Sequence, residues 1–235
     1  MIVEILYGEV CNLCGDGQNE AYLRATLPEA EFVNTALNDT PRFVTERPDL
    51  ILLGSMTEAI QRRVIGKLMP YRDRIGALIE DGVVFLATGN ACEVFTRRID
   101  YVTEEISVEG LGLFDLTVKN DLFRRYNGKF LGDVAGIPVV GFRSQFSYIY
   151  GDNSGCYFAE NPRAIGINPQ TKLEGMRRKN FIGTQVLGPI LPLNPLFTEY
   201  LLKLAGCEAQ AAYRDAAMAA YEQRLKEFRD PSTAF

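Results

Sequence analysis

The sequence predicts an α/β protein with a doubly wound, mostly parallel sheet, to which a strand-rich insertion and a C-terminal helix are added. Apolar strand-like runs and helix-like segments alternate through the first part of the chain, as in right-handed strand–helix–strand units. From Tyr101 to residue 158 the pattern changes to short strands separated by Gly, Asn and Asp turns, which indicates hairpins. Residues 208–229 have the composition of a long amphipathic helix.

The strongest single strand is the apolar run from Val83 to Ala87. Its β-branched and aromatic residues predict a strand that is buried on both faces. Thr88-Gly89-Asn90 breaks the run, and residues 91–95 continue with helix-compatible spacing. Strand, one-residue hinge and helix form the layout of a nucleophile elbow, in which a Ser or Cys stands on the turn. Here the hinge residue is Gly89, so the sequence predicts an elbow without its nucleophile.

The remaining elements are predicted from apolar runs, helix caps and Gly or Pro breaks. Before the elbow we expect strands at 2–7, 30–35 and 48–54 and helices at 20–27, 58–68 and 71–79, with Thr57 or Ser55 as a cap. After the elbow we expect strands at 113–118, 129–134, 138–142, 147–150, 156–158 and 181–187, and a helix from Pro195 to Leu204 capped by Asn194. The last helix, 208–229, is expected to pack through Ala212, Ala216, Ala219, Ala220 and Leu225, and the tail 230–235 to be loose.

These elements predict one domain, residues 1–206, with the C-terminal helix and tail, residues 207–235, packed on it. There is no internal repeat and no linker-like stretch. Ligands collect at the carboxyl ends of the strands in doubly wound sheets. We therefore expect the loop after Tyr7, the segment Gly54-Ser55-Met56 and the turn Gly89-Asn90 to meet on one edge of the sheet.

Composition excludes several classes of protein. The net charge of −5 and the scattered Lys and Arg residues argue against a nucleic-acid partner. No apolar run approaches the roughly 20 residues of a membrane span, and the N-terminus leads directly into a strand without a signal-peptide pattern. The five cysteines are an odd number without framework spacing, which suits a reducing compartment. We expect a cytoplasmic protein.

Neither a metal nor a cofactor is expected. Cys11 and Cys14 form a C-x-x-C pair, but the chain has no second pair and no histidine to complete a zinc site. A redox pair stays possible because Cys11 follows a strand, although two ordinary loop thiols are the favoured interpretation. The Gly-rich loop at residues 8–19 matches neither the P-loop nor the dinucleotide fingerprint.

The absence of histidine limits the chemistry more than any residue present. Histidine is the commonest general base near neutral pH and the usual activator of Ser or Cys nucleophiles. With no His in the chain, neither a Ser-His-Asp triad nor a Cys-His pair can exist. Chemistry based on Lys or carboxylates remains open.

Three segments in the same order resemble class I glutamine amidotransferase domains of the cobyric acid synthase type. They are Asn12–Asn19 (family Asn-Leu-Tyr-x-Asp-x-x-Asn), Glu109–Asp115 (family Glu-Gly-Leu-Gly-x-x-Asp) and Gly183–Pro195 (family Gly-Thr-x-x-His-Gly-Pro-x-Leu-Pro-x-Asn). The resemblance spans about residues 2–206 and is strongest to the amidotransferase subunits of lipid II isoglutaminyl synthases, which pair with a Mur-ligase-like subunit. It implies a flavodoxin-like, doubly wound fold.

The same resemblance implies that the family's reactive residues are replaced. The nucleophilic Cys, from an Ile-Cys-Gly-Gly-Tyr-Gln turn, aligns with Gly89, and the base His aligns with Leu187. Cys92 aligns three residues further on, where a packed core cysteine is the default interpretation. Gly at the hinge relieves backbone strain, and Leu187 avoids burying an unpaired imidazole. We therefore expect the glutaminase machinery to be absent.

A residual pocket is expected where the family holds glutamine. The oxyanion loop is reduced to Gly54-Ser55-Met56, and the family's Gly-Phe-Glu-Asn-His segment appears as residues 141–145. The expected pocket residues are Gly54, Ser55, Met56, Asn90, Cys92, Arg143 and Gln145. The bulk of Met56, Phe146 and Leu187 is expected to close the cleft in part and to exclude glutamine.

Three functions are compatible with these features. The favoured one is a catalytically silent subunit that docks on a Mur-ligase-like or other amide-forming partner, or binds a small molecule in the old pocket. The second is an active amidotransferase subunit for amidation of a cell-wall precursor (lipid II) or of a corrinoid. The third is an enzyme with new chemistry that uses Cys92, Asp16 or Glu93 at the sheet edge. The missing Cys and His count against the second.

Overall fold

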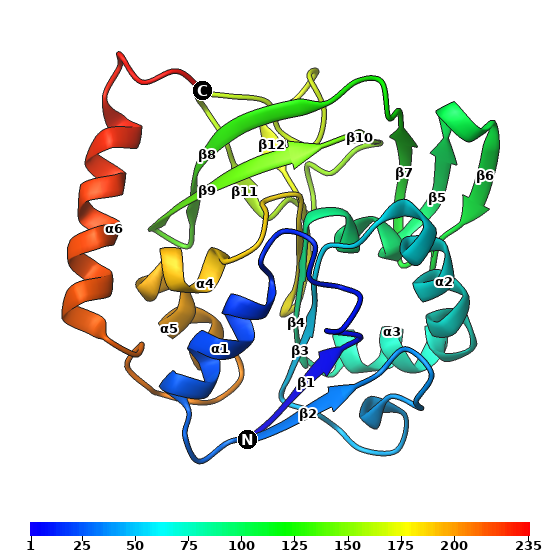
Figure 1. The fold of residues 1–235 in the computed structure, drawn as a ribbon, viewed down its shortest axis with the longest axis horizontal. Coiled ribbons are helices and arrows are strands. Elements are labelled where there is room, and N and C mark those ends of the chain that lie inside the picture. Colours follow the sequence, from blue (N-terminus) through cyan, green and yellow to red (C-terminus); the bar gives the residue numbers. More distant parts are fainter.

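The main sheet carries the architecture of this protein, whose computed structural model describes residues 1–235. Its six strands have the order β13-β14-β4-β3-β1-β2 (Figure 1). Five of them run parallel, and only β13 runs antiparallel to its neighbour β14. The strands are β1 (Ile2–Leu6), β2 (Glu31–Thr35), β3 (Leu50–Leu53), β4 (Val84–Thr88), β13 (Met176–Arg178) and β14 (Phe181–Thr184). The predicted mostly parallel sheet is confirmed.

Strand β4 lies in the interior of this sheet, as its apolar sequence predicts. It pairs with β3 on one side and β14 on the other. Val84 and Leu86 belong to one apolar core, whereas Phe85 and Ala87 belong to the core on the opposite face. Alternate residues therefore enter two different cores, which explains why the run has no polar position.

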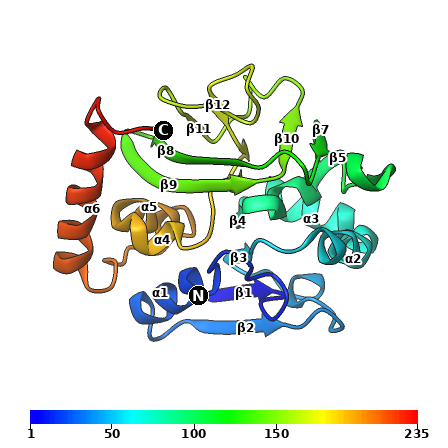
Figure 2. The ribbon, with the colours of Figure 1, turned by 45° about the horizontal axis from the view of Figure 1, so that its top comes forward.

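Helices cover both faces of the main sheet. Figure 2 shows α1, α4 and α5 on one side and α2 and α3 on the other. The helices are α1 (Gly17–Thr26), α2 (Glu58–Leu68), α3 (Arg72–Glu80), α4 (Ile190–Leu193), α5 (Pro195–Leu204) and α6 (Arg214–Arg229). Thr57 rather than Ser55 caps α2, since its Oγ1 accepts the N–H of Ile60 at 3.4 Å. None of the helices has the length and apolarity needed to cross a bilayer.

Asn194 occupies the N-cap position of α5 as predicted, but its side chain makes no capping hydrogen bond. Its side chain accepts the N–H of Val140 and donates to the carbonyl of Val140, each at 2.8 Å. The Asn194 amide thus satisfies both backbone groups of Val140 on the free edge of β9, as a neighbouring strand would, and connects α5 to the insertion. A cap prediction from local sequence missed this because Val140 is distant in the chain.

The insertion forms two four-stranded sheets, β10-β7-β5-β6 and β12-β11-β8-β9. Their strands are β5 (Thr96–Tyr101), β6 (Ile106–Glu109), β7 (Phe114–Asn120), β8 (Tyr126–Val134), β9 (Ile137–Gln145), β10 (Ser147–Tyr150), β11 (Ala159–Glu160) and β12 (Leu173–Glu174). The insertion begins at Thr96, earlier than the change of pattern expected at Tyr101, and its first two strands, β5 and β6, were not predicted. The charged residues Arg97, Arg98 and Asp100 hide the strand pattern of β5 in the sequence.

The segment after the elbow also differs from its prediction. Residues Gly89–Phe95 form a 3-10 turn rather than the start of an α-helix. The hydroxyl of Thr96 donates to the carbonyl of Glu93 at 2.7 Å, and the chain then enters β5. The turn is therefore compact, and all of its side chains but that of Asn90 are buried.

The packing face of the C-terminal helix was predicted only in part, since Leu225 is buried as expected but Ala216, Ala219 and Ala220 are not. Tyr221, Leu225 and Phe228 of α6 pack against Val140 of β9, whereas Ala216, Ala219 and Ala220 are exposed. The helix also starts later than predicted, after Tyr213, which has a left-handed backbone. The alanines indicated close packing, but the large side chains supply the buried area.

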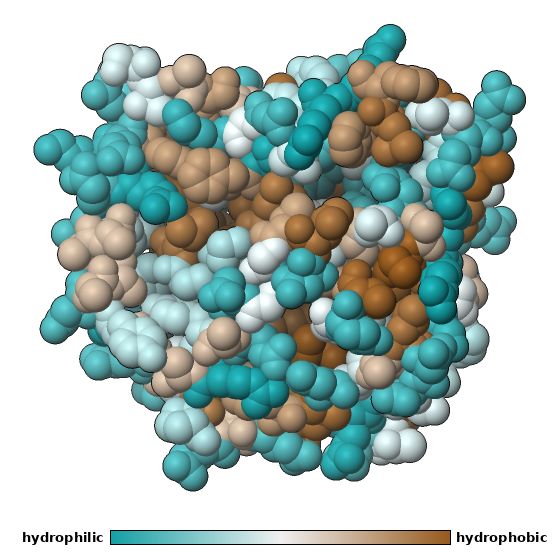
Figure 3. Space-filling view, viewed as in Figure 1, coloured by the Kyte–Doolittle hydropathy of each residue, from teal (hydrophilic) through white to brown (hydrophobic).

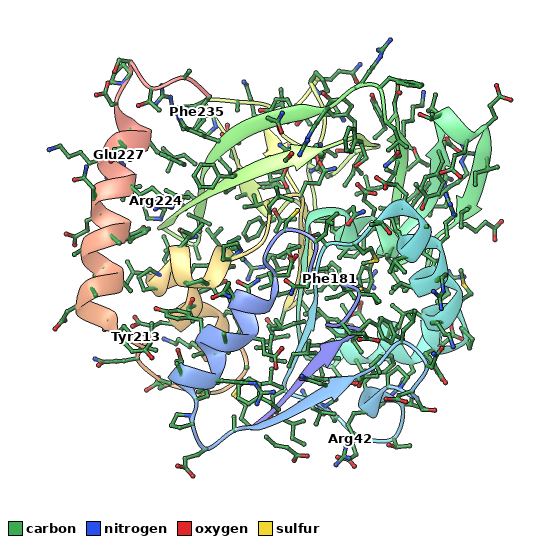
Figure 4. The ribbon with its side chains drawn as sticks, viewed as in Figure 1. Arg42, Phe181, Tyr213, Arg224, Glu227 and Phe235 are labelled. Carbon is green, nitrogen blue, oxygen red and sulfur yellow. The ribbon has the colours of Figure 1, made fainter.

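The tail is held rather than loose. Arg163 donates to the carbonyls of Phe228 (2.6 Å), Asp230 (2.9 Å) and Thr233 (3.0 Å), and its guanidinium lies 4.4 Å from the centre of the Phe235 ring. Figure 4 shows Phe235 at the end of the chain beside the top of α6. The expectation of a loose tail was wrong because Arg163, which holds it, comes from a distant loop.

Candidate functional site

Three loops meet at the carboxyl edge of the main sheet, and one carboxylate joins them. Asp16 accepts hydrogen bonds from the hydroxyls of Thr88 (2.5 Å) and Ser55 (2.6 Å). The backbone of Cys14 donates to Ser55 Oγ at 3.1 Å. These contacts, which we call the Asp16 network (Asp16, Ser55 and Thr88), connect the loops that follow β1, β3 and β4.

Gly54 is required in this arrangement because the loops approach so closely. A Cβ at that position would lie 2.1 Å from the carbonyl oxygen of Cys11 and 2.6 Å from Asp16 Cβ. The glycine at the end of β3 therefore serves the close approach of the loops. Gly54 does not reach the large cavity described below, but lines a small one of about 80 Å³ next to it.

Gly89 stands at the hinge after β4 in the left-handed backbone region, with φ of 59°. A Cβ built on it would lie 2.8 Å from Ser55 Cβ and 3.3 Å from Leu187 Cδ2. The backbone thus has the unusual conformation of an elbow, and the residue there has no side chain. Leu187 is the second-nearest side chain to that Cβ position after Ser55, so the two positions that the resemblance gives to nucleophile and base lie next to each other.

Asn90, directly after the hinge, binds the loop that carries Met56. Its Oδ1 accepts the N–H of Met56 at 3.0 Å, and its Nδ2 donates to the Met56 carbonyl at 2.7 Å. The carbonyl of Asn90 in turn accepts from Gln61 of α2 at 2.7 Å. The Met56 N–H is therefore already bonded to a side chain of the protein, and is not aimed freely at a ligand.

A cavity of about 320 Å³ opens beside Gly89 and Leu187. It is lined by Leu13, Cys14, Ser55, Met56, Glu58, Gly89, Asn90, Glu93, Asn120, Arg125, Ser144, Gln145, Phe146, Ser147, Gln185 and Leu187. This volume lies at the low end of the range for small-molecule sites. Met56, Phe146 and Leu187, which were expected to close the cleft in part, all line this cavity, and the exclusion of glutamine stays a prediction. Most of the Met56 side chain packs in the core, where it is 1% exposed and its sulfur lies 3.8 Å from that of Cys11.

The floor of the cavity holds a buried carboxyl group, Glu93. It accepts hydrogen bonds from Gln61 Nε2 (2.9 Å), from the hydroxyl of Ser147 and, more weakly, from Gln185 Nε2 (3.4 Å). Burial raises the pKa of Glu93 to about 7, although these donors oppose the shift. The negative charge of Glu58, which lines the same cavity, adds to the increase in pKa.

Cys92, one of the expected pocket residues, does not line this cavity. It is fully buried in the core that includes Phe95 and Phe181. Burial is the main cause that raises its pKa well above the usual value, so the thiol stays protonated and weakly nucleophilic. The sequence placed it near the edge because it follows the hinge, but the 3-10 turn directs it inward.

Arg143 is also directed away from the cavity. It is 1% exposed and donates to the carbonyls of Ile165 (2.9 Å) and Gly166 (2.7 Å) and to Gln185 Oε1 (2.8 Å), with Glu174 as ion-pair partner at 3.1 Å. Arg143 and Gln145 lie on the same face of β9, and the Arg143 Nε donates to Gln145 Oε1 at 2.9 Å. The guanidinium of Arg143 is therefore fully engaged by protein groups behind the cavity, while Ser144 lines the cavity from the strand's other face. Gln145, next to it, does line the cavity as expected.

Several lining residues were not predicted from the sequence. Glu58 begins α2, Asn120 ends β7, and Arg125 lies in the β7–β8 loop. The last two come from the insertion, and no motif in the sequence shows that it folds back over the carboxyl edge of the main sheet. The sequence therefore predicted the loops at the carboxyl edge of the sheet, but not the residues of the insertion that form the other side of the cavity.

Comparisons with known proteins bear on the fold and on distant homology. No protein-family model matches the chain. It is 28% identical over 175 residues to lipid II isoglutaminyl synthase (glutamine-hydrolyzing) subunit GatD of Staphylococcus aureus (strain N315). The matched segment covers 73% of this chain and 69% of that protein.

Two solved structures have the same fold. A crystal structure of a glutamine amidotransferase matches with a TM-score of 0.59 and 16% identity, over 88% of this chain and all of that chain. The PurLQS structure from Thermotoga maritima matches with a TM-score of 0.53 and 10% identity, over 95% of this chain and 98% of that chain. The protein therefore has the class I glutamine amidotransferase-like fold and is a distant homologue of GatD.

Proposed function

We propose that this chain is a GatD-like subunit that does not hydrolyse glutamine and acts as the non-catalytic partner of a Mur-ligase-like or other amide-forming enzyme. One observation carries the proposal: Gly89, with φ of 59°, stands at the hinge and faces Leu187. A glycine offers no nucleophile, and a leucine cannot accept a proton. The chain has no histidine elsewhere that could replace the base.

Other residues near the site do not favour an active enzyme. The buried Cys92 has a raised pKa and lies outside the cavity, which speaks against its use as a displaced nucleophile. Asp16 has both oxygens bonded to hydroxyls within its own network, so it is committed to structure. The relative is named a glutamine-hydrolysing synthase subunit, and this proposal retains its subunit role without the hydrolysis.

The proposal also covers the organisation and location of the chain. Residues 1–206 form the amidotransferase-like domain, and residues 207–235 are the helix and tail that pack on it. All five cysteines are free, which is consistent with work in the reducing cytoplasm. The open cavity retains room for a small molecule, whose binding would not require chemistry.

Ammonia release from glutamine tests the proposal. The purified chain, alone and with a Mur-ligase-like protein from the same genome, is expected to release no more ammonia than a buffer blank. Gly89→Cys alone is expected to stay inactive, because Leu187 leaves the new thiol without a base and Ser55 Cβ crowds it at 2.8 Å. Glutamine hydrolysis by the unmodified chain, in either state, contradicts the proposal.

A further inference from the structure

Exposed apolar side chains gather at the mouth of the cavity. Four of the eight large apolar side chains that are most exposed belong to segments beside the cavity: Leu13 (61%), Val102 (49%), Leu122 (38%) and Phe123 (87%). Leu13 lines the cavity itself, and Leu122 and Phe123 lie between Asn120 and Arg125, which also line it. We call these four residues the mouth patch. Figure 3 shows hydrophobic surface over the β7–β8 loop, at the upper right of that view.

The strand pairing brings these residues together. Strands β5 and β7 run parallel, so both end at the same edge, where Tyr101 pairs with Asn120. Val102 directly follows β5, and Leu122 and Phe123 follow β7. The N–H of Leu122 donates to Thr103 Oγ1 at 3.1 Å, which joins the two ends. Leu13 lines the cavity from a different segment, the loop after β1.

Phe123 is held outward by a tight turn rather than by a free loop. Asp121 Oδ1 accepts the N–H of Phe123 at 3.1 Å, and the Asp121 carbonyl accepts the N–H of Arg124 at 2.9 Å. The N–H of Asp121 donates to the carbonyl of Phe146, a lining residue of the cavity, at 2.8 Å. The ordered backbone presents the Phe123 side chain outward, and an aromatic residue has only two side-chain dihedrals to order on binding, which favours a role as an interface anchor.

The charge beside this anchor indicates which kind of partner fits. Arg125 lies two residues after Phe123, and no carboxylate lies within ion-pair distance of it. Its Nε and Nη2 both donate to Ser144 Oγ, at 2.8 and 2.6 Å, and its guanidinium lies 5.4 Å from the Phe146 ring centre. A partner surface that pairs with Arg125 must supply an acidic group next to an apolar socket.

A second copy of this chain does not satisfy that requirement in a symmetric contact. Twofold symmetry would place patch against patch, and the two unpaired Arg125 guanidinium groups would then face each other. Scattered single apolar residues on a surface need no explanation, but a group that borders a cavity often marks an interaction site. The chemistry therefore favours a different protein with a carboxylate at the contact.

We propose that the mouth patch, with Phe123 as its anchor and Arg125 as its charged contact, docks the amide-forming protein partner and covers the cavity. The inference rests on the proposed function for the existence of that partner. It adds where the partner binds, and it implies that the cavity opens toward the partner.

Affinity measurements with matched variants test the proposal. The probe is the Mur-ligase-like protein from the same genome, immobilised, with the full chain in solution. Phe123→Ala is expected to weaken binding roughly thirtyfold, as for an interface hot spot, and Arg125→Gln about tenfold, with a loss that shrinks at high salt. Tyr213→Ala is the control, because Tyr213 is 76% exposed but lies at the start of α6, at the lower left of Figure 4.

The outcomes separate the two proposals. No binding by the unmodified chain contradicts the proposed function, and the docking proposal with it. Tight binding that Phe123→Ala and Arg125→Gln leave unchanged contradicts the mouth patch alone. Self-association of the free chain that Phe123→Ala abolishes would assign the patch to a second copy and would also overturn the proposal. Both variants are expected to keep the unfolding temperature of the unmodified chain, since the side chains are exposed.

Discussion

The Asp16 network and the Gly89–Leu187 pair lie at the same edge of the main sheet. The residues of the network are joined by hydrogen bonds, whereas Gly89 and Leu187 are in apolar contact only. Asp16 connects the loops after β1, β3 and β4 through Ser55 and Thr88. Gly89 and Leu187 only touch, and neither carries a group that reacts. The difference shows that the interactions that hold this edge together are separate from the residues that would do chemistry. The fold can therefore persist when the reactive residues are absent.

The largest expected effect is the loss of unfolding free energy when the Asp16 network is removed, compared with the loss when Leu187 is shortened. Asp16→Ala leaves two hydroxyls without their acceptor, which should cost about 3 kcal/mol of unfolding free energy. Leu187→Ala, at a half-buried position, should cost clearly less than Asp16→Ala. Urea unfolding of the two variants measures this order, with Asp16→Asn as an isosteric control for the lost charge. A larger cost for Leu187→Ala would show that the apolar pair, not the network, holds the edge.

The carboxyl group on the cavity floor gives the second prediction, through pH. The pKa of Glu93 is about 7 in the folded chain and near 4.5 when unfolded, so the folded state holds a proton that the unfolded state releases. Its contribution to stability is fully present below pH 4.5 and is lost as pH rises through 7, by about 3 kcal/mol in total.

Glu93→Gln keeps the shape of the side chain and removes the titration. The unfolding free energy of the unmodified chain should therefore fall relative to that of Glu93→Gln between pH 5 and pH 8. Urea unfolding at both pH values provides the measurement. A constant difference between the two proteins would mean that Glu93 is not desolvated as the structure indicates.

The smallest expected effect isolates the crowding at the hinge. Gly89→Ala introduces a Cβ at a left-handed position, which costs about 1–2 kcal/mol, and also places it 2.8 Å from Ser55 Cβ. Gly82→Ala is the matched control, because Gly82 has φ of 80° but its nearest neighbour would be 3.6 Å away. Gly89→Ala should be the more destabilising of the two in thermal unfolding. Equal costs would show that Ser55 moves aside easily.

The sequence predicted the parts of the fold that depend on local pattern. β4 could be recognised because its residues enter two cores, and α2 because it has a cap and a Pro break. The carboxyl edge followed from the alternation of strands and helices. The hinge glycine was visible because it directly follows a buried strand.

The parts that the sequence did not predict depend on contacts between distant segments. Arg143 points to the interior because Glu174 and two carbonyls receive it there, and Cys92 is buried because the 3-10 turn is compact. The outer wall of the cavity comes from the insertion, whose direction no local pattern records. The packing face of α6 depended on β9. In each case the deciding partner lies far away along the chain.

Covalent labelling tests the central claim most directly, that the elbow has no working nucleophile. The chain is incubated with a glutamine-analogue diazo-ketone, and its intact mass is measured before and after. We expect no added mass on the unmodified chain or on Gly89→Cys, since no base activates a thiol beside Leu187. Added mass on the unmodified chain that glutamine suppresses, and that Cys92→Ala or Cys14→Ala removes, would show a live site and contradict the account.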